Sequence, residues 1–191
     1  MTVAQVDADR RPIPGTEQEF DCDTLLLSVG LIPENELTRG AGITLSGVTS
    51  GAVVDDRLMT DVPGIFACGN VLHVHDLVDF VSEESTNAGR AAAAWAIGER
   101  TTSATVAVQD GFGVRGVVPQ CVHVGSSQPV NLMFRPGGVF KGKACVVRSG
   151  GRELSRKRSL VFTPGEMAVI TLKPEMLRDV TEPLTVALED V

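Results

Sequence analysis

The residues Thr60–Asn70, TDVPGIFACGN, begin the stretch that decides the fold of this chain. Within it, Gly64–Gly69 is a short apolar run that ends on a glycine, and a glycine lets the backbone turn sharply or approach a ligand closely. A helix is predicted next, beginning between Asp76 and Ser82 and ending at Gly98, because glycine commonly follows the last helical residue. The sequence therefore predicts a strand, a tight turn and a long helix in succession.

The predicted helix has one apolar stripe and many small side chains. Charged residues fall outside the stripe, at Glu83, Glu84 and Arg90. The small residues around Gly89 would let the helix axis approach a sheet closely, which suits a cofactor-binding layer and equally suits any tight core. The stripe itself consists of Leu77, Val81, Ser85, Ala88, Ala92 and Trp95.

Further strands are predicted before this helix from short apolar runs that turn residues bound. Thr24–Val29 is too short for a helix and suits a strand that is covered on both faces, as in a parallel sheet. Ala52–Asp55 has the same character. Thr2–Val6 and Glu19–Cys22 are also strand-like, with a turn between them. Residues 1–104 are therefore expected to be α/β.

The remainder of the chain is predicted to be all-β. Thr101–Thr105 resembles a linker, and Gly150-Gly151 suits a two-residue hairpin turn. Many short alternating strands without a long helix favour a small antiparallel β-sandwich or barrel over residues 105–191. Strands are predicted at Val130–Arg135, Ala144–Arg148, Leu160–Phe162, Ala168–Leu172 and Leu184–Leu188.

The charge balance differs between the same two halves. Net charge and the length of the apolar runs also argue against nucleic-acid binding and a membrane span. The 191-residue chain has a net charge of -7, and residues 1–104 hold 16 acidic and 6 basic side chains against 8 and 11 in residues 105–191. This surplus of acid argues against a protein that binds nucleic acid through its phosphates. No apolar run approaches the roughly 20 residues that span a bilayer, so no membrane span is expected. No signal-peptide pattern opens the sequence, and the default expectation is a cytoplasmic protein.

Three other patterns have simple interpretations. The cysteines are too far apart for a redox dithiol or half of a zinc site, so scattered buried thiols are expected. The G-x-G-x-x-G pattern over Gly111–Gly116 precedes Val117-Val118-Pro119, which opposes a helix, so it is not interpreted as a phosphate loop. The basic run Arg152–Arg158 suits a solvated strand edge. The cysteines are Cys22, Cys68, Cys121 and Cys145.

Two stretches resemble a known family. Thr60–Asn70, followed by Ala88-Gly89-Arg90 and an alanine run, resembles the second FAD-binding motif of the pyridine nucleotide-disulfide oxidoreductase superfamily. In that motif Thr, six residues, Ala, one residue, Gly and Asp precede a helix aimed at the flavin. Upstream, Ser28–Asn35, SVGLIPEN, resembles the turn by which the family passes from its NAD(P) domain back to its FAD domain. The resemblance covers about residues 1–100.

The resemblance implies a set of residues that contact FAD. The backbone at Gly69 would come close to the cofactor and Asn70 would hold the ribityl chain. The family usually has Asp at position 70, and a neutral Asn makes a weaker hydrogen bond than a carboxylate. Free N–H groups at the helix start would face the pyrimidine edge of the flavin. By the family pattern Val81, Ser82 and Glu83 lie there, and His75 contacts the ring or caps the helix.

The loop after Asn70 also contains residue types that bind metal ions. A loop with the pattern H-x-H-D could hold a divalent cation. Its position directly after the flavin motif favours a role beside the cofactor instead. The residues of this candidate metal cluster are His73, His75, Asp76 and Asp79.

The resemblance implies a fold and an activity for the whole protein. The fold is an incomplete FAD/NAD(P)-binding three-layer fold, with residues 1–30 ending the NAD(P) domain and 31–104 forming an FAD-domain segment, followed by the β-rich domain 105–191. The activity is FAD-dependent oxidoreduction with NAD(P)H as co-substrate, hydride passing between nicotinamide and flavin N5. Both phosphate loops lie upstream in the family, so this chain alone is expected to be inactive and to need a missing N-terminal portion.

Two further expectations concern partners. The β-rich half, with Val117–Gln120 and Thr163–Met167, resembles bacterial NAD(P)/FAD-dependent oxidoreductases encoded beside anaerobic glycerol-3-phosphate dehydrogenase-like proteins. Dehydrogenase subunits are therefore candidate partners. The alternative function is a non-catalytic scaffold or assembly module derived from such a flavoprotein. In that case unpaired strand edges around Thr24–Val29 would favour a homodimer.

Overall fold

The computed structural model describes all 191 residues and divides them into two compact units, Met1–Leu31 and Ile32–Val191. In the first unit, strand β1 (Thr2–Val3) pairs antiparallel with β2 (Gln18–Glu19). The turn between them is ordered by the Asp7 carboxylate, which accepts two backbone N–H groups. Both strand-like segments predicted here are confirmed, although each is shorter than the sequence indicated.

The strand predicted over Thr24–Val29 is absent, and that prediction was wrong. Leu26 is 90% exposed and Val29 79% exposed. A strand buried on both faces needs hydrogen-bonding neighbours, and no other segment of the 191 residues pairs with this one. The apolar run therefore lies open to solvent.

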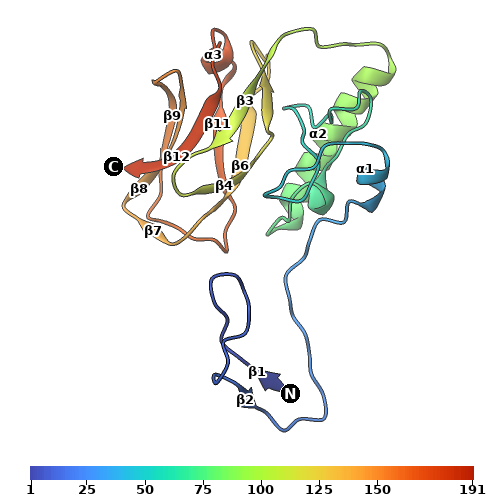
Figure 1. Cartoon of the computed structure of the whole chain (residues 1–191). Helices are drawn as coiled ribbons and strands as arrows, with labels where there is room; N and C mark the ends of the chain where they lie inside the picture. Colours follow the sequence, from blue (N-terminus) through green and yellow to red (C-terminus); the bar gives the residue numbers. More distant parts are fainter. The chain divides into compact units, whose positions relative to one another are not determined.

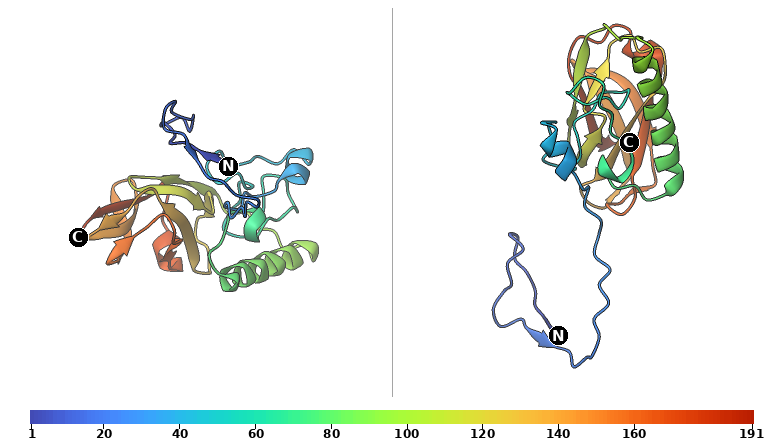
Figure 2. Two further views of the ribbon diagram at one scale, coloured as in Figure 1. Left: turned by 90° about the horizontal axis from the view of Figure 1, so that it is seen from below. Right: turned by 90° about the vertical axis from the view of Figure 1, so that its right-hand side faces the viewer.

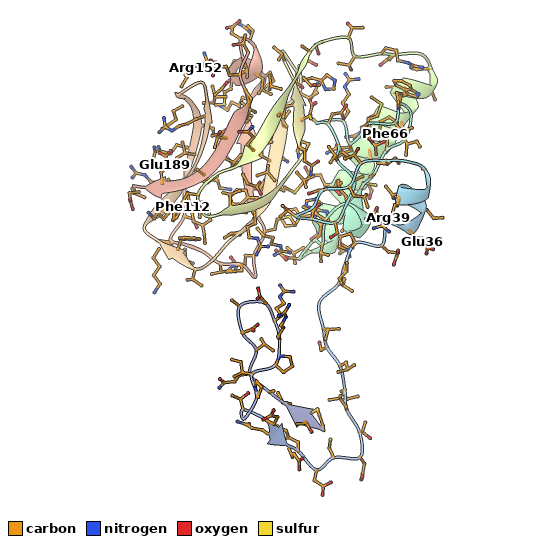
Figure 3. The ribbon with its side chains drawn as sticks, in the orientation of Figure 1. Glu36, Arg39, Phe66, Phe112, Arg152 and Glu189 are labelled. Atoms are coloured by element: carbon orange, nitrogen blue, oxygen red, sulfur yellow. The ribbon has the colours of Figure 1, made fainter.

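The second unit begins with a region of turns and helices. Its helices are α1 (Glu36–Gly40), the short 3₁₀ helix η1 (Gly69–Val71), α2 (Val78–Ala96) and, late in the chain, α3 (Pro174–Leu177). The bounds of α2 confirm the predicted helix, and Gly98 follows it with a positive φ of 91°. Helix α1 was not predicted, and its Glu36 and Arg39 side chains are exposed (Figure 3).

The strands predicted at Ala52–Asp55 and Gly64–Gly69 are also wrong. The backbone here makes only isolated antiparallel bridges, such as Val54 with Thr60. The cause is local, because the Asp55 carboxylate accepts the N–H groups of Arg57 and Met59 and turns the chain back within five residues. Successive tight turns therefore replace the extended strands of a parallel sheet.

The rest of the second unit consists mainly of two sheets (Figure 1). One has the order β5-β3-β12-β8-β9 and the other β11-β6-β4, while β10 pairs with β7. All neighbours are antiparallel except β12 and β3. The bounds are β3 Thr105–Asp110, β4 Val114–Val118, β5 Cys121–His123, β6 Val130–Pro136, β7 Phe140–Lys141, β8 Lys143–Ser149, β9 Arg152–Arg158, β10 Val161–Phe162, β11 Ala168–Leu172 and β12 Leu184–Asp190.

These strands confirm the strand positions predicted for residues 130–188. Buried and less buried side chains alternate along strands such as β6 and β12, and buried residues of both belong to one core. Along β6 every second side chain is buried, and Leu132 and Phe134 pack into a cluster with Leu184 of β12. The hairpin turn at Gly150-Gly151 is confirmed by two positive φ angles, 53° and 81°. The basic run forms β9, which is an edge strand as predicted. Arg156 of β9 and Arg148 of β8 bind Glu189 of β12 there.

Helix α2 lies beside the β11-β6-β4 sheet (Figure 2). Phe80 of the helix and Met133 of β6 line the same small cavity of about 100 Å³. A second core joins the region before the strands to β4, because Val118 is fully buried there together with Val54 and Leu72. The chain is thus a sheet-rich mixed structure with few helices. No helix is long and apolar enough to span a membrane.

Candidate functional site

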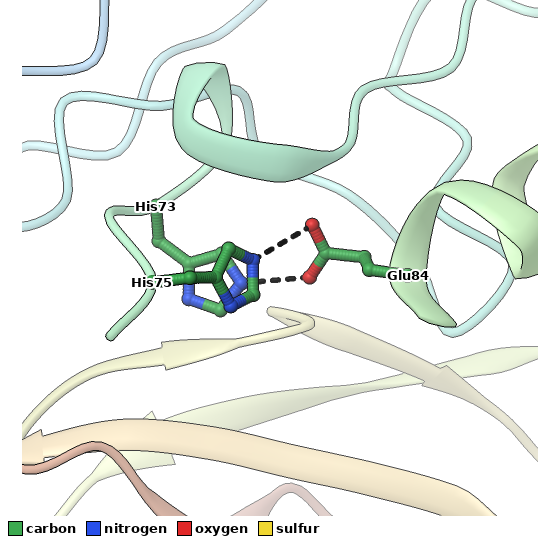
Figure 4. A group of neighbouring side chains, drawn as sticks. All are labelled: His73, His75 and Glu84. Carbon is green, nitrogen blue, oxygen red and sulfur yellow. Dashed lines mark hydrogen bonds and ion pairs between the residues drawn. The ribbon is translucent and has the colours of Figure 1, made fainter. Parts of the chain in front are cut away.

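A buried cluster connects helix α2 to the loop that follows η1 (Figure 4). The Nε2 atom of His73 lies 2.7 Å from Oε2 of Glu84, and Nε2 of His75 lies 3.2 Å from Oε1. The Glu84, His73 and His75 side chains are 2%, 5% and 1% exposed. Oε1 also accepts the N–H of Gly69. One carboxylate thus holds the glycine of the motif and both imidazoles of the loop.

The burial of Glu84 corrects the predicted helix stripe, which placed this residue outside. Glu84 and Ala88 are the two buried residues of α2, and residues four apart share a helix face. The prediction assigned every charged side chain to solvent, which is the usual outcome for an unpaired carboxylate. Two histidines earlier in the chain were the available signal that this carboxylate has buried partners.

The hydrogen bonds of Glu84 keep its carboxyl group ionised. Burial by itself would raise the pKa of this group. Hydrogen bonds with His73 and His75 and from the Gly69 N–H outweigh burial and lower the pKa to about 2. A negative charge is therefore present in the interior at neutral pH, and its stability depends on these donors.

Gly69 is required by its own backbone and by the helix that passes beside it. Its φ is +71°, a left-handed conformation that side chains disfavour. A Cβ built on it would lie 3.3 Å from Cγ1 of Val81. The glycine of the motif thus permits both the turn after residue 68 and the close approach of α2.

Asn70 and the start of α2 are the exposed parts of the motif. The Asn70 side chain is exposed, and its Oδ1 accepts the N–H of His75 at 3.1 Å. Leu77, the residue before α2, gives no side-chain cap, so the N–H groups of the first turn have no side-chain acceptor. Ser82 and Glu83 are exposed one turn later, where the Ser82 hydroxyl donates to the Val78 carbonyl.

These residues fit one end of an FAD molecule. An exposed amide beside an uncapped helix start offers donors to ribityl hydroxyls and to an electron-rich ring edge. No phosphate cradle accompanies them. The G-x-G-x-x-G pattern lies at the β3–β4 turn, where a Cβ on Gly111 would meet the Val186 carbonyl oxygen at 2.8 Å. Gly111 and Gly113 thus permit close packing against β12, whereas Gly116 faces Val48 and Thr49.

His75 and the two acidic residues of the loop have separate surroundings. The His75 ring faces Glu84 and does not cap α2. Asp76 pairs instead with Arg135 of β6 and accepts the N–H of Met167. Asp79 is exposed in the first turn of α2. Of the four residues with metal-binding side chains in this loop, the structure brings His73 and His75 together, and Glu84 of α2 is the carboxylate beside them.

Comparison with known proteins agrees with the motif. Residues 1–111 match the model of the pyridine nucleotide-disulphide oxidoreductase family, which is more than half of the chain. The chain belongs to this family. The members of this family are FAD- and NAD(P)-dependent oxidoreductases, which agrees with the resemblance.

Three curated relatives match shorter segments of the chain. The ferredoxin–NADP reductase of Leuconostoc mesenteroides is 28% identical over 43% of this chain and 23% of its own length. An alkyl hydroperoxide reductase component of Xanthomonas campestris pv. phaseoli is 38% identical over 31% of this chain and 11% of its own length. The mitochondrial dihydrolipoyl dehydrogenase of Caenorhabditis elegans is 41% identical over 30% of this chain and 12% of its own length. The chain thus spans less than a quarter of each relative. No solved structure matched it.

The chain has a third buried histidine, His123, which the sequence did not indicate. Nδ1 of His123 binds Asp56, and its Nε2 lies 3.9 Å from Oδ2 of Asp55. The hydrogen bond with Asp56 raises the pKa of His123 despite burial. The two partners are 67 residues apart in sequence, so no local pattern could pair them. They border a polar cavity of about 550 Å³ that Glu83 and Arg90 of α2 also line.

The cysteines differ from the expectation of buried thiols. All four are unpaired, and only Cys145 is buried, while Cys22 is exposed. Burial raises the pKa of the Cys145 thiol to about 12. A thiol with so high a pKa is unreactive at neutral pH, since the thiolate is the reactive form. Cys145 therefore contributes to packing.

Proposed function

We propose that this chain is the C-terminal portion of an FAD-dependent NAD(P)H oxidoreductase and that it supplies the surface for the ribityl chain and flavin ring. The observation that carries the proposal is the exposed Asn70 side chain beside the uncapped start of α2. Its Oδ1 is engaged by the His75 N–H, so its amide Nδ2 is the atom that donates to a ribityl hydroxyl.

The residues of this surface have different tasks in the proposal. Gly69 allows the turn, and Val81, which packs against it, fixes the distance between the turn and the helix. Ser82 and Glu83 border the ring at the first exposed turn of α2. His75 positions Asn70 through its backbone, and its ring secures the loop to Glu84. When bound, FAD supplies the chemistry by accepting a hydride from the nicotinamide.

The remainder of the proposal concerns the whole protein. A portion N-terminal to this family region would supply both phosphate loops, residues 1–30 would end the NAD(P) domain, and residues 31–104 would complete a three-layer FAD domain. The β-sandwich-like residues 105–191 would be an accessory domain that contacts dehydrogenase partner subunits. This assignment follows the resemblance to bacterial enzymes encoded beside anaerobic glycerol-3-phosphate dehydrogenase-like proteins. A cytoplasmic location belongs to the same proposal.

A second candidate function rests on a different observation. The run Leu25–Leu31 is exposed throughout, with Leu26 at 90% and Leu27 at 74%. Exposed apolar segments of this kind mark surfaces that bind other chains. This favours a scaffold in which the run associates with a second copy of the chain, without catalysis.

Flavin titration of the full chain tests the first proposal. We expect riboflavin, FMN and FAD to bind with similar affinity, because the phosphates find no loop here, and to show a shift of the visible absorbance bands. Asn70→Asp should tighten binding, since a carboxylate accepts a stronger hydrogen bond, and Asn70→Leu should weaken it about tenfold. Asn87→Leu, on the exposed middle of α2, is the control that should change nothing.

Two outcomes would contradict the proposal. An unchanged spectrum for every flavin, from a folded chain that sediments as a stable dimer, would favour the scaffold. Binding that responds equally to the changes at Asn70 and Asn87 would show that flavin occupies some other surface.

A further inference from the structure

The two imidazoles of the buried cluster have incomplete hydrogen bonding. Each gives its Nε2 to Glu84, and each leaves its Nδ1 buried with no partner. The rings meet edge to face, with centroids 4.3 Å apart. Buried polar atoms in folded proteins nearly always have partners. Two unpartnered nitrogens in neighbouring rings therefore indicate that the cluster lacks a component.

The donor atoms of the cluster are already gathered. One ring nitrogen from His73, one from His75 and one oxygen of Glu84 lie within 4.8 Å of one another. Around an ion with bonds of about 2.0–2.2 Å, tetrahedral ligand atoms lie roughly 3.5 Å apart. Small side-chain shifts are therefore sufficient to admit an ion. The Nε2 atoms face the Glu84 carboxylate and are the ligand atoms of an ion shared with it, and the ring protons would then be on the Nδ1 atoms.

The chemistry of the donors selects the kind of ion. Two imidazoles and one carboxylate suit zinc and other first-row divalent transition metals, whereas magnesium and calcium prefer oxygen ligands throughout. The three side chains are at most 5% exposed, so the set is not a chance group of surface acids. The Glu84 carboxylate is the only acidic group of the cluster, and a cation would compensate its charge in the interior.

We propose that His73, His75 and Glu84 bind one divalent transition-metal ion of the zinc class. Three protein ligands leave at least one position for water. Glu84 also lines a small cavity of about 100 Å³ beside α2, together with Glu83 and Asp56. The site ties the motif turn to α2, and it can be tested without flavin because its three side chains are buried.

The full chain without flavin is the protein to test, with Zn²⁺ and Co²⁺ as probes. We expect close to one equivalent of Zn²⁺ to remain after gel filtration, and visible d–d bands on adding Co²⁺. X-ray absorption of the zinc form should show nitrogen and oxygen neighbours at about 2.0–2.1 Å and no sulfur at about 2.3 Å. This distinguishes the cluster from the four free cysteines.

Variants locate the ion within the chain. His73→Gln and Glu84→Gln should each weaken Zn²⁺ binding at least tenfold. Asp79→Asn changes an exposed acid of the same sequence motif and should leave the affinity unchanged. Circular dichroism identifies any variant that fails to fold. If a variant fails, the X-ray absorption spectrum of the zinc-loaded wild-type chain still shows whether nitrogen and oxygen ligands bind the ion.

Several results would overturn the proposal. These are less than about a tenth of an equivalent of Zn²⁺ on the folded wild-type chain, sulfur in its first shell, or an equal loss in Asp79→Asn. A crystal structure grown with Zn²⁺ that shows no anomalous signal between the two imidazoles and the Glu84 carboxylate would also overturn it. Because no flavin is present, failure here is distinct from failure of the flavin proposal.

Discussion

Nε2 of His73 and Oε2 of Glu84 lie 2.7 Å apart, and the two residues are eleven positions apart in sequence. Their contact connects the loop after the glycine turn to helix α2. Both side chains are almost fully buried. Removing the charge of such a carboxylate leaves its donors poorly satisfied. Glu84→Gln should therefore lower the free energy of unfolding by about 1–3 kcal/mol in urea denaturation. Its exposed neighbour gives the control, because Glu83→Gln should cost less than about 0.5 kcal/mol.

Replacing Gly69, beside helix α2, and Gly89, within it, by alanine should change the stability in opposite directions. Gly69→Ala places a side chain at a φ of +71° and 3.3 Å from Val81, so we expect a loss of about 1–2 kcal/mol of stability. Gly89→Ala meets no atom within 4 Å in a helix interior and should gain about 0.5–1 kcal/mol. Thermal denaturation of both variants checks this. Equal effects of the same sign would refute the assigned role of Gly69.

His123 should make stability depend on pH. Its hydrogen bond with Asp56 raises its pKa above the ordinary value of 6.5. The histidine therefore contributes stability that is fully present below pH 6.5 and is lost as pH rises through the higher folded value. NMR titration of the ring protons should give this raised pKa, and Asp56→Asn should lower it. Asp9→Asn, in the turn of the first unit, should have no effect.

The exposed apolar run should be replaceable without loss of stability. Leu26 and Val29 are 90% and 79% exposed, so changing both to serine removes no buried contact. The free energy of unfolding should change by less than about 0.5 kcal/mol. Light scattering should show a lower average mass if the wild-type chain associates through this run. A large loss of stability would mean that the run is buried against another part of the protein.

The sequence predicted the elements that depend only on residues close together in the chain. The alternation along Val130–Arg135, the glycine pair at the hairpin and the glycine after α2 each depend on neighbouring residues only, and all three are confirmed. The predicted strands at Thr24–Val29 and Ala52–Asp55 were wrong for different reasons. The first has no partner to pair with, and in the second a turn at Asp55 prevents extension.

The candidate site was predictable only in part. The family motif pointed to Gly69 and Asn70, and the loop histidines pointed to a metal or a flavin. The pattern could not show that Glu84 turns inward, because a charged residue on a helix is normally solvated. The pairing of His123 with Asp56 was also out of reach, since it depends on how β5 meets a turn far earlier in the chain.

Strand β4 has adjacent residues in two different cores. Val117 belongs to the cluster between the β-sheets, whereas Val118 belongs to the cluster with Val54 and Leu72. Neighbouring residues of a strand point to opposite faces, so one strand forms a wall of both interiors. Neither interior can therefore be opened to water without exposing the other. Residues 32–191 should lose their structure in one cooperative step, and a cut in the loop near residue 102 should leave two pieces that stay together.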